Sequence, residues 1–201
     1  MTITYEYFKS LYVNITNRCS NACTFCVRNN HDDVNGKDNL WLEHEPTIDE
    51  IKADFETRDL SKYDAIVFCG YGEPTERIDD VVEISKWLKH KNKNIKIRIN
   101  TNGQTNLIAN RDVTSEFKDV IDCVSISLNA ENADKYQILC RSRFGGDAAF
   151  EGLQDFARLE KKTVPEVIFT VVDIMPKDEI EECRKIAENC GVKFRVRKYI
   201  K

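Results

Sequence analysis

Six short β-prone runs alternate with helical segments, and this alternation constrains the fold more than any other feature of the chain. Repeated β-then-α units place parallel strands side by side with helices outside them. A closed eight-stranded barrel typically needs about 250 residues, whereas this chain has 201. We therefore expect one α/β domain, residues 1–201, with a curved and open (β/α)6 sheet. The predicted strands are residues 11–16, 65–69, 95–100, 121–128, 166–172 and 193–199.

Start and stop signals place the helices between these strands. Thr47 followed three residues later by Glu50 is a capping box, which opens a helix that runs to about Arg58. A last helix begins near Pro176 and ends before Gly191, because proline suits the first turn and glycine the position past the end. Two further helices are marked by residues at helical spacing, Ile78, Val81, Val82, Ser85 and Leu88 in one and Phe150, Leu153 and Ala157 in the other.

The predicted strands have one apolar and one polar face. In residues 11–16, 95–100 and 123–128, branched apolar residues alternate with polar ones. The apolar face is expected to lie under the helices. A closed barrel fills its interior with branched apolar side chains, so a polar inward face predicts a lumen that holds a ligand. The alternative is that these polar faces are partly solvated.

Composition places the chain among globular proteins without a visible membrane or export signal. Charged residues make up 32% of it and mix both signs to a net charge of -4, which argues against a simple nucleic-acid-coating protein. No apolar run approaches the ~20 residues that span a bilayer, and the start lacks a basic segment followed by an apolar one. We expect a cytoplasmic protein with no membrane contact, whose 8 cysteines are reduced thiols.

Three of those cysteines, Cys19, Cys23 and Cys26, follow the first predicted strand with the spacing C-x3-C-x2-C. Three thiolates can hold three irons of a [4Fe–4S] cube and leave the fourth iron open to a substrate or cofactor, whereas a cluster that only transfers electrons normally takes four cysteines. A structural zinc site is the alternative, with His31 as the nearest fourth ligand. Zinc sites usually pair two C-x2-C units, and the chain has no second pair.

The other cysteines are not expected to form a second cluster. Cys183 and Cys190 share the apolar stripe of the last predicted helix, where free cysteine packs as a small hydrophobic residue. Cys69 and Cys123 lie in predicted strands, and Cys140 stands alone near a helix end. One cluster per chain is therefore predicted.

The cysteine motif, with Phe25 before its last cysteine and a strand before its first, resembles the signature of the radical S-adenosylmethionine (radical SAM) superfamily. The segment Gly70-Tyr71-Gly72-Glu73-Pro74 follows the second predicted strand and resembles that superfamily's Gly-Glu-Pro segment, although Tyr71 stands where many relatives have glycine. The resemblance extends over nearly the whole chain. Residues 11–19 and 40–47 are similar to the small radical SAM group named for its association with TatD proteins.

The resemblance implies a partial TIM-like (β/α)6 barrel, the radical SAM core, with one oxygen-sensitive [4Fe–4S] cluster on Cys19, Cys23 and Cys26. Bound to the open iron, S-adenosylmethionine (SAM) is cleaved by the reduced cluster to a 5′-deoxyadenosyl radical that abstracts hydrogen from the substrate. The protein supplies placement and exclusion of water. The residues that the resemblance assigns to SAM are Phe25, Gly70, Gly72, Glu73, Pro74, Asn100, Asn102, Ser125, Ser127 and Asn129.

Individual roles within this set also follow from the resemblance. Glu73 stands where the family meets the methionyl amine, and glycine at positions 70 and 72 would let the backbone approach SAM closely. Asn100 and Asn102 follow the third predicted strand and contact the ribose on one interpretation, or form an Asn-Gly turn with Gly103 on the other. Relatives contact the ribose or the methionyl carboxylate from the inward face of the fourth strand, which carries Ser125, Ser127 and Asn129.

Basic residues on the inward faces of the third and sixth strands, and after the helix that follows the fourth, point to an anionic substrate. Arginine matches the geometry of carboxylate or phosphate groups. The alternative is an exposed edge strand whose charges discourage edge-to-edge pairing. The candidate substrate residues are Arg98, Arg141, Arg195 and Arg197, with Lys96 and Arg143 nearby.

We expect a radical SAM enzyme that acts on an anionic or nucleic-acid-related substrate, because TatD proteins are hydrolases of nucleic acids. A homodimer or residues 29–39 would enclose that substrate. The alternatives are a glycyl-radical-activase-like enzyme that acts on a protein or peptide, and a non-catalytic metal-binding module. The expected partners are a flavodoxin- or ferredoxin-type reductant and, functionally, a TatD-family hydrolase.

Overall fold

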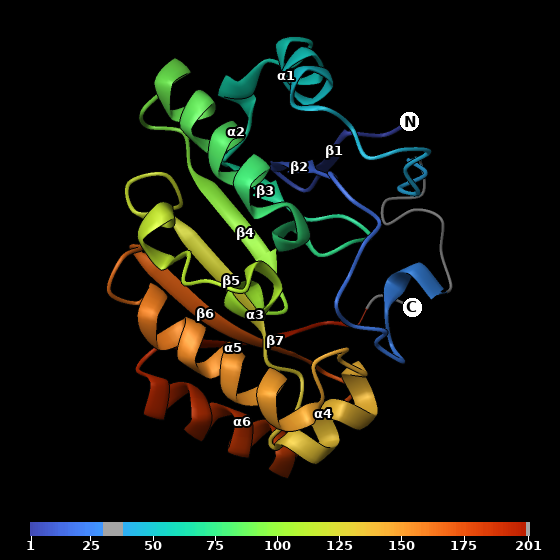
Figure 1. Ribbon diagram of the computed structural model, residues 1–201, viewed down its shortest axis with the longest axis vertical. Helices are drawn as coiled ribbons and strands as arrows, with labels where there is room; N and C mark the ends of the chain where they lie inside the picture. The colour runs from blue at the N-terminus through green and yellow to red at the C-terminus, as the bar shows by residue number, and fades with distance from the viewer. Residues whose placement is uncertain (30–37, 200–201) are drawn as a thin grey trace.

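The computed structural model describes residues 1–29 and 38–199, which form a seven-stranded sheet with helices packed along it (Figure 1). From β2 to β7, every neighbouring pair of strands is parallel. The predicted α/β fold, a partial TIM-like (β/α)6 barrel, is therefore confirmed. In sheet order the strands are β1 (Thr4–Tyr7), β2 (Ser10–Val13), β3 (Ala65–Phe68), β4 (Ile97–Thr101), β5 (Cys123–Ser127), β6 (Glu166–Val172) and β7 (Lys193–Arg197).

The edge strand β1, which the sequence analysis missed, pairs antiparallel with β2. Tyr5 is the register partner of Tyr12, and Phe8 turns the hairpin with a φ of 52°. On the outer face, the Thr4 hydroxyl donates a hydrogen bond to the Asp54 carboxylate of the following helix at 2.7 Å. Four residues are too few for a periodic pattern, and phenylalanine at a left-handed turn position gives no hairpin signal.

The helices alternate with the strands as expected. The Thr47 hydroxyl accepts a hydrogen bond from the Glu50 N–H, and the Glu50 carboxylate accepts one from the Thr47 N–H, so the predicted capping box is present. Gly191 ends the last helix in the left-handed region, with a φ of 67°. The α-helices are α1 (Ile48–Glu56), α2 (Ile78–Lys91), α3 (Thr105–Ala109), α4 (Ala133–Cys140), α5 (Gly146–Glu160) and α6 (Lys177–Cys190).

Short 3-10 helices complete the connections in the described ranges: η1 (Val27–Asn29), η2 (Leu60–Lys62), η3 (Pro74–Arg77) and η4 (Thr114–Phe117). None of the helices in those ranges combines the length and apolar character needed to cross a bilayer. Residues 30–37 lie outside the described part of the chain. The predicted enclosure of a substrate by residues 29–39, and His31 as a zinc ligand, therefore fall largely on residues whose placement is not described.

The core lies between the apolar strand faces and the helices. The apolar residues of the three alternating strands, on the face that the helices cover, are fully buried, which confirms the predicted faces: Leu11, Val13, Ile97, Ile99, Val124 and Ile126. Cys183 and Cys190 of α6 are buried in the same core, as the helical stripe predicted. The polar residues between the buried ones face the other side of the sheet.

Two strands begin later than predicted because the carboxylate of Asp122 takes part in the strand starts. It accepts hydrogen bonds from the Ile97 N–H at 2.8 Å and from Lys89 Nζ at 2.6 Å. Lys96 also pairs with Asp122, at 3.4 Å, and is exposed. Lys96 is thus held at the entry to β4 by Asp122 and does not join the inward basic residues, contrary to the expectation.

Candidate active site

The loop that carries the three cysteines, residues 18–29, follows β2 at the carboxyl ends of the parallel strands, where α/β sheets place their sites. Its backbone docks on the end of α4: the N–H groups of Ala22 and Thr24 donate to the carbonyls of Cys140 and Leu139 at 3.0 and 2.9 Å. The Ser20 carbonyl accepts from the N–H of a residue beyond α4, Arg143, at 2.9 Å. We call residues 18–29 the cysteine loop.

A buried network of neutral polar side chains fixes the cysteine loop from within the domain. Gln104 Nε2 donates to Asn21 Oδ1 and to the Tyr136 hydroxyl, both at 2.9 Å. Asn21 Nδ2 also donates to the Tyr136 hydroxyl, at 3.1 Å, and the Ser142 hydroxyl donates to Gln104 Oε1 at 2.9 Å. Fully hydrogen-bonded buried networks of this kind make a local structure rigid. Sequence reasoning gave none of these four residues a role.

The pKa of each thiol in the cysteine loop is raised. Burial raises the pKa of Cys19 to about 12, with a further contribution from Glu73. A hydrogen bond with Cys140, followed by burial, raises that of Cys23, and burial raises that of Cys26. Iron binds thiolates, so loading a cluster would release these protons.

The donor set of the loop fits a [4Fe–4S] cluster with one open iron. Within residues 1–29 and 38–199, no three His, Cys, Asp or Glu side chains converge on a point as the ligands of a single metal ion do. A cube cluster does not need such convergence, because each thiolate binds a different iron. The predicted assignment of Cys19, Cys23 and Cys26 to a cluster is therefore compatible with the loop.

Arg28 places a positive charge beside the cysteines, which opposes the rise in the pKa of all three thiols. Its guanidinium donates to the carbonyls of Asn17, Asn21 and Tyr71, each at 3.4 Å. One side chain thus joins both ends of the cysteine turn to the segment after β3. The sequence analysis assigned Arg28 no role, and the only signal was a basic residue two positions after Cys26.

The segment from Gly70 to Pro74 packs closely against the chain after β2. A Cβ on Gly72 would lie 2.2 Å from the Thr16 carbonyl oxygen, and one on Gly70 would lie 2.0 Å from Asn14 Oδ1. The fold of the protein itself therefore requires glycine at both positions, which is a different reason from the expected close approach to SAM. Pro74 occupies the first turn of η3.

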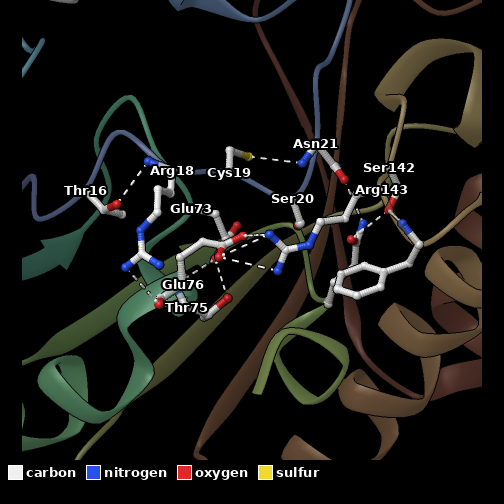
Figure 2. Close-up of polar contacts among 12 residues, drawn as sticks. Thr16, Arg18, Cys19, Ser20, Asn21, Glu73, Thr75, Glu76, Ser142 and Arg143 are labelled. Carbon is white, nitrogen blue, oxygen red and sulfur yellow. Dashed lines mark hydrogen bonds and ion pairs between the residues drawn. The ribbon is translucent and has the colours of Figure 1, made fainter. Parts of the chain in front are cut away.

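Glu73 is buried and joins two loops; Figure 2 shows its carboxylate close to Thr75. Its Oε1 accepts hydrogen bonds from the N–H and the hydroxyl of Thr75 at 3.1 and 2.8 Å, and its Oε2 accepts one from the Asn102 N–H at 2.7 Å. Burial raises the pKa of Glu73, and these hydrogen bonds act against that rise. Its contact with a methionyl amine stays a prediction, in which the ligand would share oxygens that already cap η3.

Asn102 also uses its side chain within the protein. Its Nδ2 donates to the Ser20 hydroxyl at 2.7 Å, and its Oδ1 accepts from the Gln104 N–H at 3.0 Å. By contrast, Asn100 and Asn129 each have a buried Oδ1 without a hydrogen-bond partner among the described residues. A buried acceptor without a partner is costly, so these two amides are better placed than Asn102 to receive donors from a ligand.

The remaining residues expected at SAM lie in the same region of the fold. Ser125 and Ser127 alternate with the apolar Val124 and Ile126 along β5, so they share its inward face. Phe25 is partly buried and packs against the main core. The structure thus brings the candidate set to the carboxyl ends of β2 to β5, and its contacts with SAM stay predictions.

Three of the four candidate substrate arginines lie on the inward side of the sheet. Arg98 Nη2 donates to the Tyr12 hydroxyl at 3.0 Å. Desolvation on this crowded face, together with the charges of Arg195 and Arg98, lowers the pKa of Arg197, although the side chain keeps an exposed surface. Arg141 lies elsewhere: it is the exposed C-cap of α4, with a φ of 48°, next to the cysteine loop.

The three inward arginines differ from most other arginines of the described chain, which form ion pairs with carboxylates. None of the ion pairs between described residues involves Arg98, Arg195 or Arg197. In Figure 2, the Arg143 guanidinium reaches Glu76, at 3.1 Å. The other pairs are Arg18–Glu45, Arg58–Asp54, Arg77–Asp80, Arg111–Asp79, Arg158–Asp155 and Arg184–Glu181.

A surface hollow of about 560 Å³ lies outside this region, between the start of α1, the start of α2 and α3. It is lined by side chains that already form ion pairs, such as Arg18 with Glu45 and Arg77 with Asp80. We do not place the chemistry there, because none of the cysteines lines it.

Comparison with known proteins supports the assignment of the chain to the radical SAM superfamily. Residues 13–190 match the family described as the radical SAM superfamily. A protein of Methanocaldococcus jannaschii, whose name proposes that it activates a glycyl-radical enzyme, is 30% identical over 158 residues, which cover 76% of this chain and 62% of that protein. The chain therefore spans less than two thirds of the length of this curated relative.

Two solved structures share the fold. SuiB of Streptococcus suis bound to S-adenosylmethionine superposes with a TM-score of 0.67 at 17% identity, covering 96% of this chain and 41% of that one. TYW1 with a lysine-pyruvate adduct superposes with a TM-score of 0.65 at 15% identity, covering 96% and 65%. The superfamily uses a [4Fe–4S] cluster and SAM, in agreement with the expected cofactors. With its family match over most of its length and its cysteine loop at the end of the first parallel strand, the chain belongs to the radical SAM superfamily.

Proposed function

We propose that the protein is an enzyme that cleaves SAM reductively, with Cys19, Cys23 and Cys26 as the ligands of its cluster. The observation that carries this proposal is the cysteine loop itself: three thiols on one rigidly docked loop, against which the Gly70–Pro74 segment packs. A bound, reduced [4Fe–4S] cluster supplies the electron that splits SAM into methionine and a 5′-deoxyadenosyl radical.

The residues of the chain place SAM and exclude water in this proposal. The Oδ1 atoms of Asn100 and Asn129, buried without a partner among the described residues, would accept hydrogen bonds from SAM. Ser125 and Ser127 line the inward face of β5 between them. Gly70, Gly72, Glu73, Pro74, Asn102 and Phe25 shape the wall, with Glu73 and Asn102 acting mainly through the loops that they hold together.

We further propose that the substrate is anionic and binds on the inward face of the sheet. Arg98, Arg195 and Arg197 lie close together there without a carboxylate partner among the described residues, so an anion would relieve their mutual repulsion. Arg141 extends the positive charge toward the cysteine loop. The superfamily membership leaves little support for a non-catalytic metal-binding module.

An anaerobic assay with reconstituted protein, SAM and dithionite tests the activity. We expect about four irons and four sulfides per chain and formation of 5′-deoxyadenosine. The Cys19→Ala, Cys23→Ala and Cys26→Ala variants should lose both. Cys183→Ala serves as the matched control, because that thiol is buried in the core. A fully loaded cluster that never cleaves SAM, with or without cell extract, would contradict the proposal.

A second candidate function is the activation of a protein by formation of a glycyl radical. The name of the Methanocaldococcus jannaschii relative favours it. In that case the open side of the sheet would admit a polypeptide loop, and 5′-deoxyadenosine formation would depend on a partner protein. Electron paramagnetic resonance of the partner after reaction would distinguish a glycyl radical from a small-molecule product.

Other features of the proposed setting await separate tests. A flavodoxin- or ferredoxin-type protein would deliver the electron. Membership of the TatD-associated group, a functional link to a TatD-family hydrolase, a homodimer that encloses the substrate and a cytoplasmic location are likewise hypotheses. Sedimentation of the purified protein tests the dimer, and copurification tests the link.

A further inference from the structure

The β1–β2 hairpin turns a set of tyrosines toward the inward face of the sheet. Tyr5 is the register partner of Tyr12, and Tyr7 lies two residues further along β1 on the same face. The ring of Tyr12 lies 5.3 Å from that of Tyr5 and 5.6 Å from that of Tyr7. Tyr5 is buried, whereas Tyr7 and Tyr12 keep accessible surface. The hairpin thus adds an aromatic wall to one end of the sheet.

Tyr12 connects this aromatic wall to the arginines. Through β3, it lies in the same register row as Arg98 of β4, whose Nη2 donates to the Tyr12 hydroxyl at 3.0 Å. No described residue accepts the proton of that hydroxyl, and Arg98 Nε is buried without a partner. One unused O–H donor and one unused N–H donor therefore lie next to each other.

The last strand β7 adds Arg197 to the same inward face, where it is the register partner of Val172 of β6. Arg197 is close enough to Tyr12, Cys69 and Arg98 for their charges to act on its own. An arginine from the last strand and a tyrosine from the second strand therefore share one region of the inward face. Packing explains the buried Tyr5, but it does not explain guanidinium groups that lack a carboxylate partner among the described residues and lie beside partly exposed rings.

We propose that this region binds a nucleoside 5′-phosphate, with Arg98 and Arg197 on the phosphate and the rings of Tyr7 and Tyr12 against the base. The proposal rests on the proposed function and names its substrate class. Guanidinium groups bind phosphate with matching geometry. Aromatic side chains stack with any nucleobase, because every base has a π-face. An acidic peptide would satisfy the arginines but would make no use of the accessible ring surface of Tyr7 and Tyr12.

Calorimetric titration of the anaerobically reconstituted protein tests the proposal. The probes are the four common ribonucleoside 5′-monophosphates, their nucleosides, inorganic phosphate, benzoate and a single-stranded hexanucleotide. At least one monophosphate should bind at least 10-fold more tightly than its nucleoside and than inorganic phosphate, since stacking adds about 5- to 100-fold. Preference for the hexanucleotide would identify a nucleotide within a strand, and preference for the monomer would identify a free nucleotide.

Variants test separately the tyrosines proposed to contact the base and the arginines proposed to contact the phosphate. Tyr12→Leu should reduce nucleotide affinity to that of inorganic phosphate, whereas Tyr12→Phe should keep most of it. Arg197→Gln should reduce it to that of the nucleoside. Arg158→Gln is the matched control, because this arginine pairs with Asp155 on the exposed side of α5, and it should change nothing. Circular dichroism verifies that each variant is folded.

The outcomes decide between the proposals. Equal affinity for nucleotide and phosphate, no binding of any nucleotide, tighter binding of benzoate than of every monophosphate, or indifference to Tyr12→Leu overturns the nucleotide assignment. The formation of 5′-deoxyadenosine by the same preparation is measured in parallel. If SAM is cleaved while nucleotides fail to bind, the substrate inference fails and the proposed reaction stands. If SAM is not cleaved by a loaded cluster, the proposed function fails regardless of binding.

Discussion

The Glu73 carboxylate and the Asn102 N–H form a buried hydrogen bond of 2.7 Å that joins the loop after β3 to the loop after β4. Thr75 donates two more hydrogen bonds to the other oxygen of that carboxylate. Because donors approach both carboxylate oxygens of Glu73, residue 73 must present a hydrogen-bond acceptor at each of these two positions. Glu73 thus has a structural task in addition to any contact with SAM.

Replacing Glu73 with glutamine should destabilise the protein by about 1–3 kcal/mol, because the amide presents an NH2 group to one of these donors. Urea denaturation of the protein without cluster measures the change. Glu56→Gln is the comparison: it weakens an exposed ion pair with Lys91 and should cost less. Equal stability of E73Q and the wild type would show that the two loops are held by other contacts.

Gly72→Ala should destabilise the fold by more than about 2 kcal/mol, because its Cβ would lie 2.2 Å from a backbone carbonyl oxygen that cannot move alone. Gly152→Ala is the matched control. Its Cβ would meet the end of the flexible Leu107 side chain at 2.8 Å, and alanine favours the helix. Thermal unfolding monitored by circular dichroism compares the two. A smaller loss for position 72 than for position 152 would contradict the packing argument.

Gln104→Leu should loosen the cysteine loop, because it removes a donor to Asn21 and Tyr136 and the acceptor of Ser142. We expect a loss of about 1–3 kcal/mol in stability and a lower yield of bound iron on reconstitution. Iron per chain and the rate of cluster loss in air are the measurements. Gln154→Leu, at a partly exposed position of α5, is the control. Unchanged iron content and lifetime in Q104L would mean that the network does not hold the cluster ligands.

The buried carboxyl of Glu160 should make stability depend on pH. Burial raises its pKa to about 8, while a hydrogen bond from Thr163 acts in the opposite direction. Between its unfolded pKa of about 4.3 and about 8, the folded protein holds a proton that the unfolded chain has lost. This group therefore lowers the free energy of unfolding as pH rises, by up to about 1.4 kcal/mol per pH unit.

Glu160→Gln should match the wild type near pH 4.5 and become more stable than it by pH 8. Urea denaturation of both proteins across this range gives the difference, in which the other titrating groups cancel. A constant difference between the two proteins over the range would show that Glu160 is ionised in the folded state.

The sequence was a good guide wherever a local pattern decides the structure. The parallel order of β2 to β7, the capping box at Thr47 and the end of α6 at Gly191 all follow from periodicity or from residues within one turn. The buried positions of Cys183 and Cys190 follow from helical spacing alone. Each of these features depends on residues that are close together in the chain.

Features that depend on distant residues could not be predicted. Asn21 meets Gln104 across 83 positions and Tyr136 across 115. Glycine at position 72 was assigned to cofactor approach, because nothing in the sequence shows that the Thr16 carbonyl would lie beside it. Strand β1 was missed because its aromatic residues indicate a strand only through their pairing with Tyr12 of β2, which the sequence does not show. Motifs identified the chemistry, whereas the supporting contacts required the folded chain.

The hydrogen-bonded set around Gln104 has a consequence for electron transfer. Amide and hydroxyl groups make up the whole set, and burial raises the pKa of its phenol, Tyr136, far above the range in which proteins are folded. None of these groups can gain or lose a proton when the charge of a neighbouring centre changes by one electron. The hydrogen-bonded set behind the cysteines therefore keeps the same protonation state when a cluster on the cysteine loop is oxidised or reduced. Its geometry should be the same in both oxidation states of that cluster.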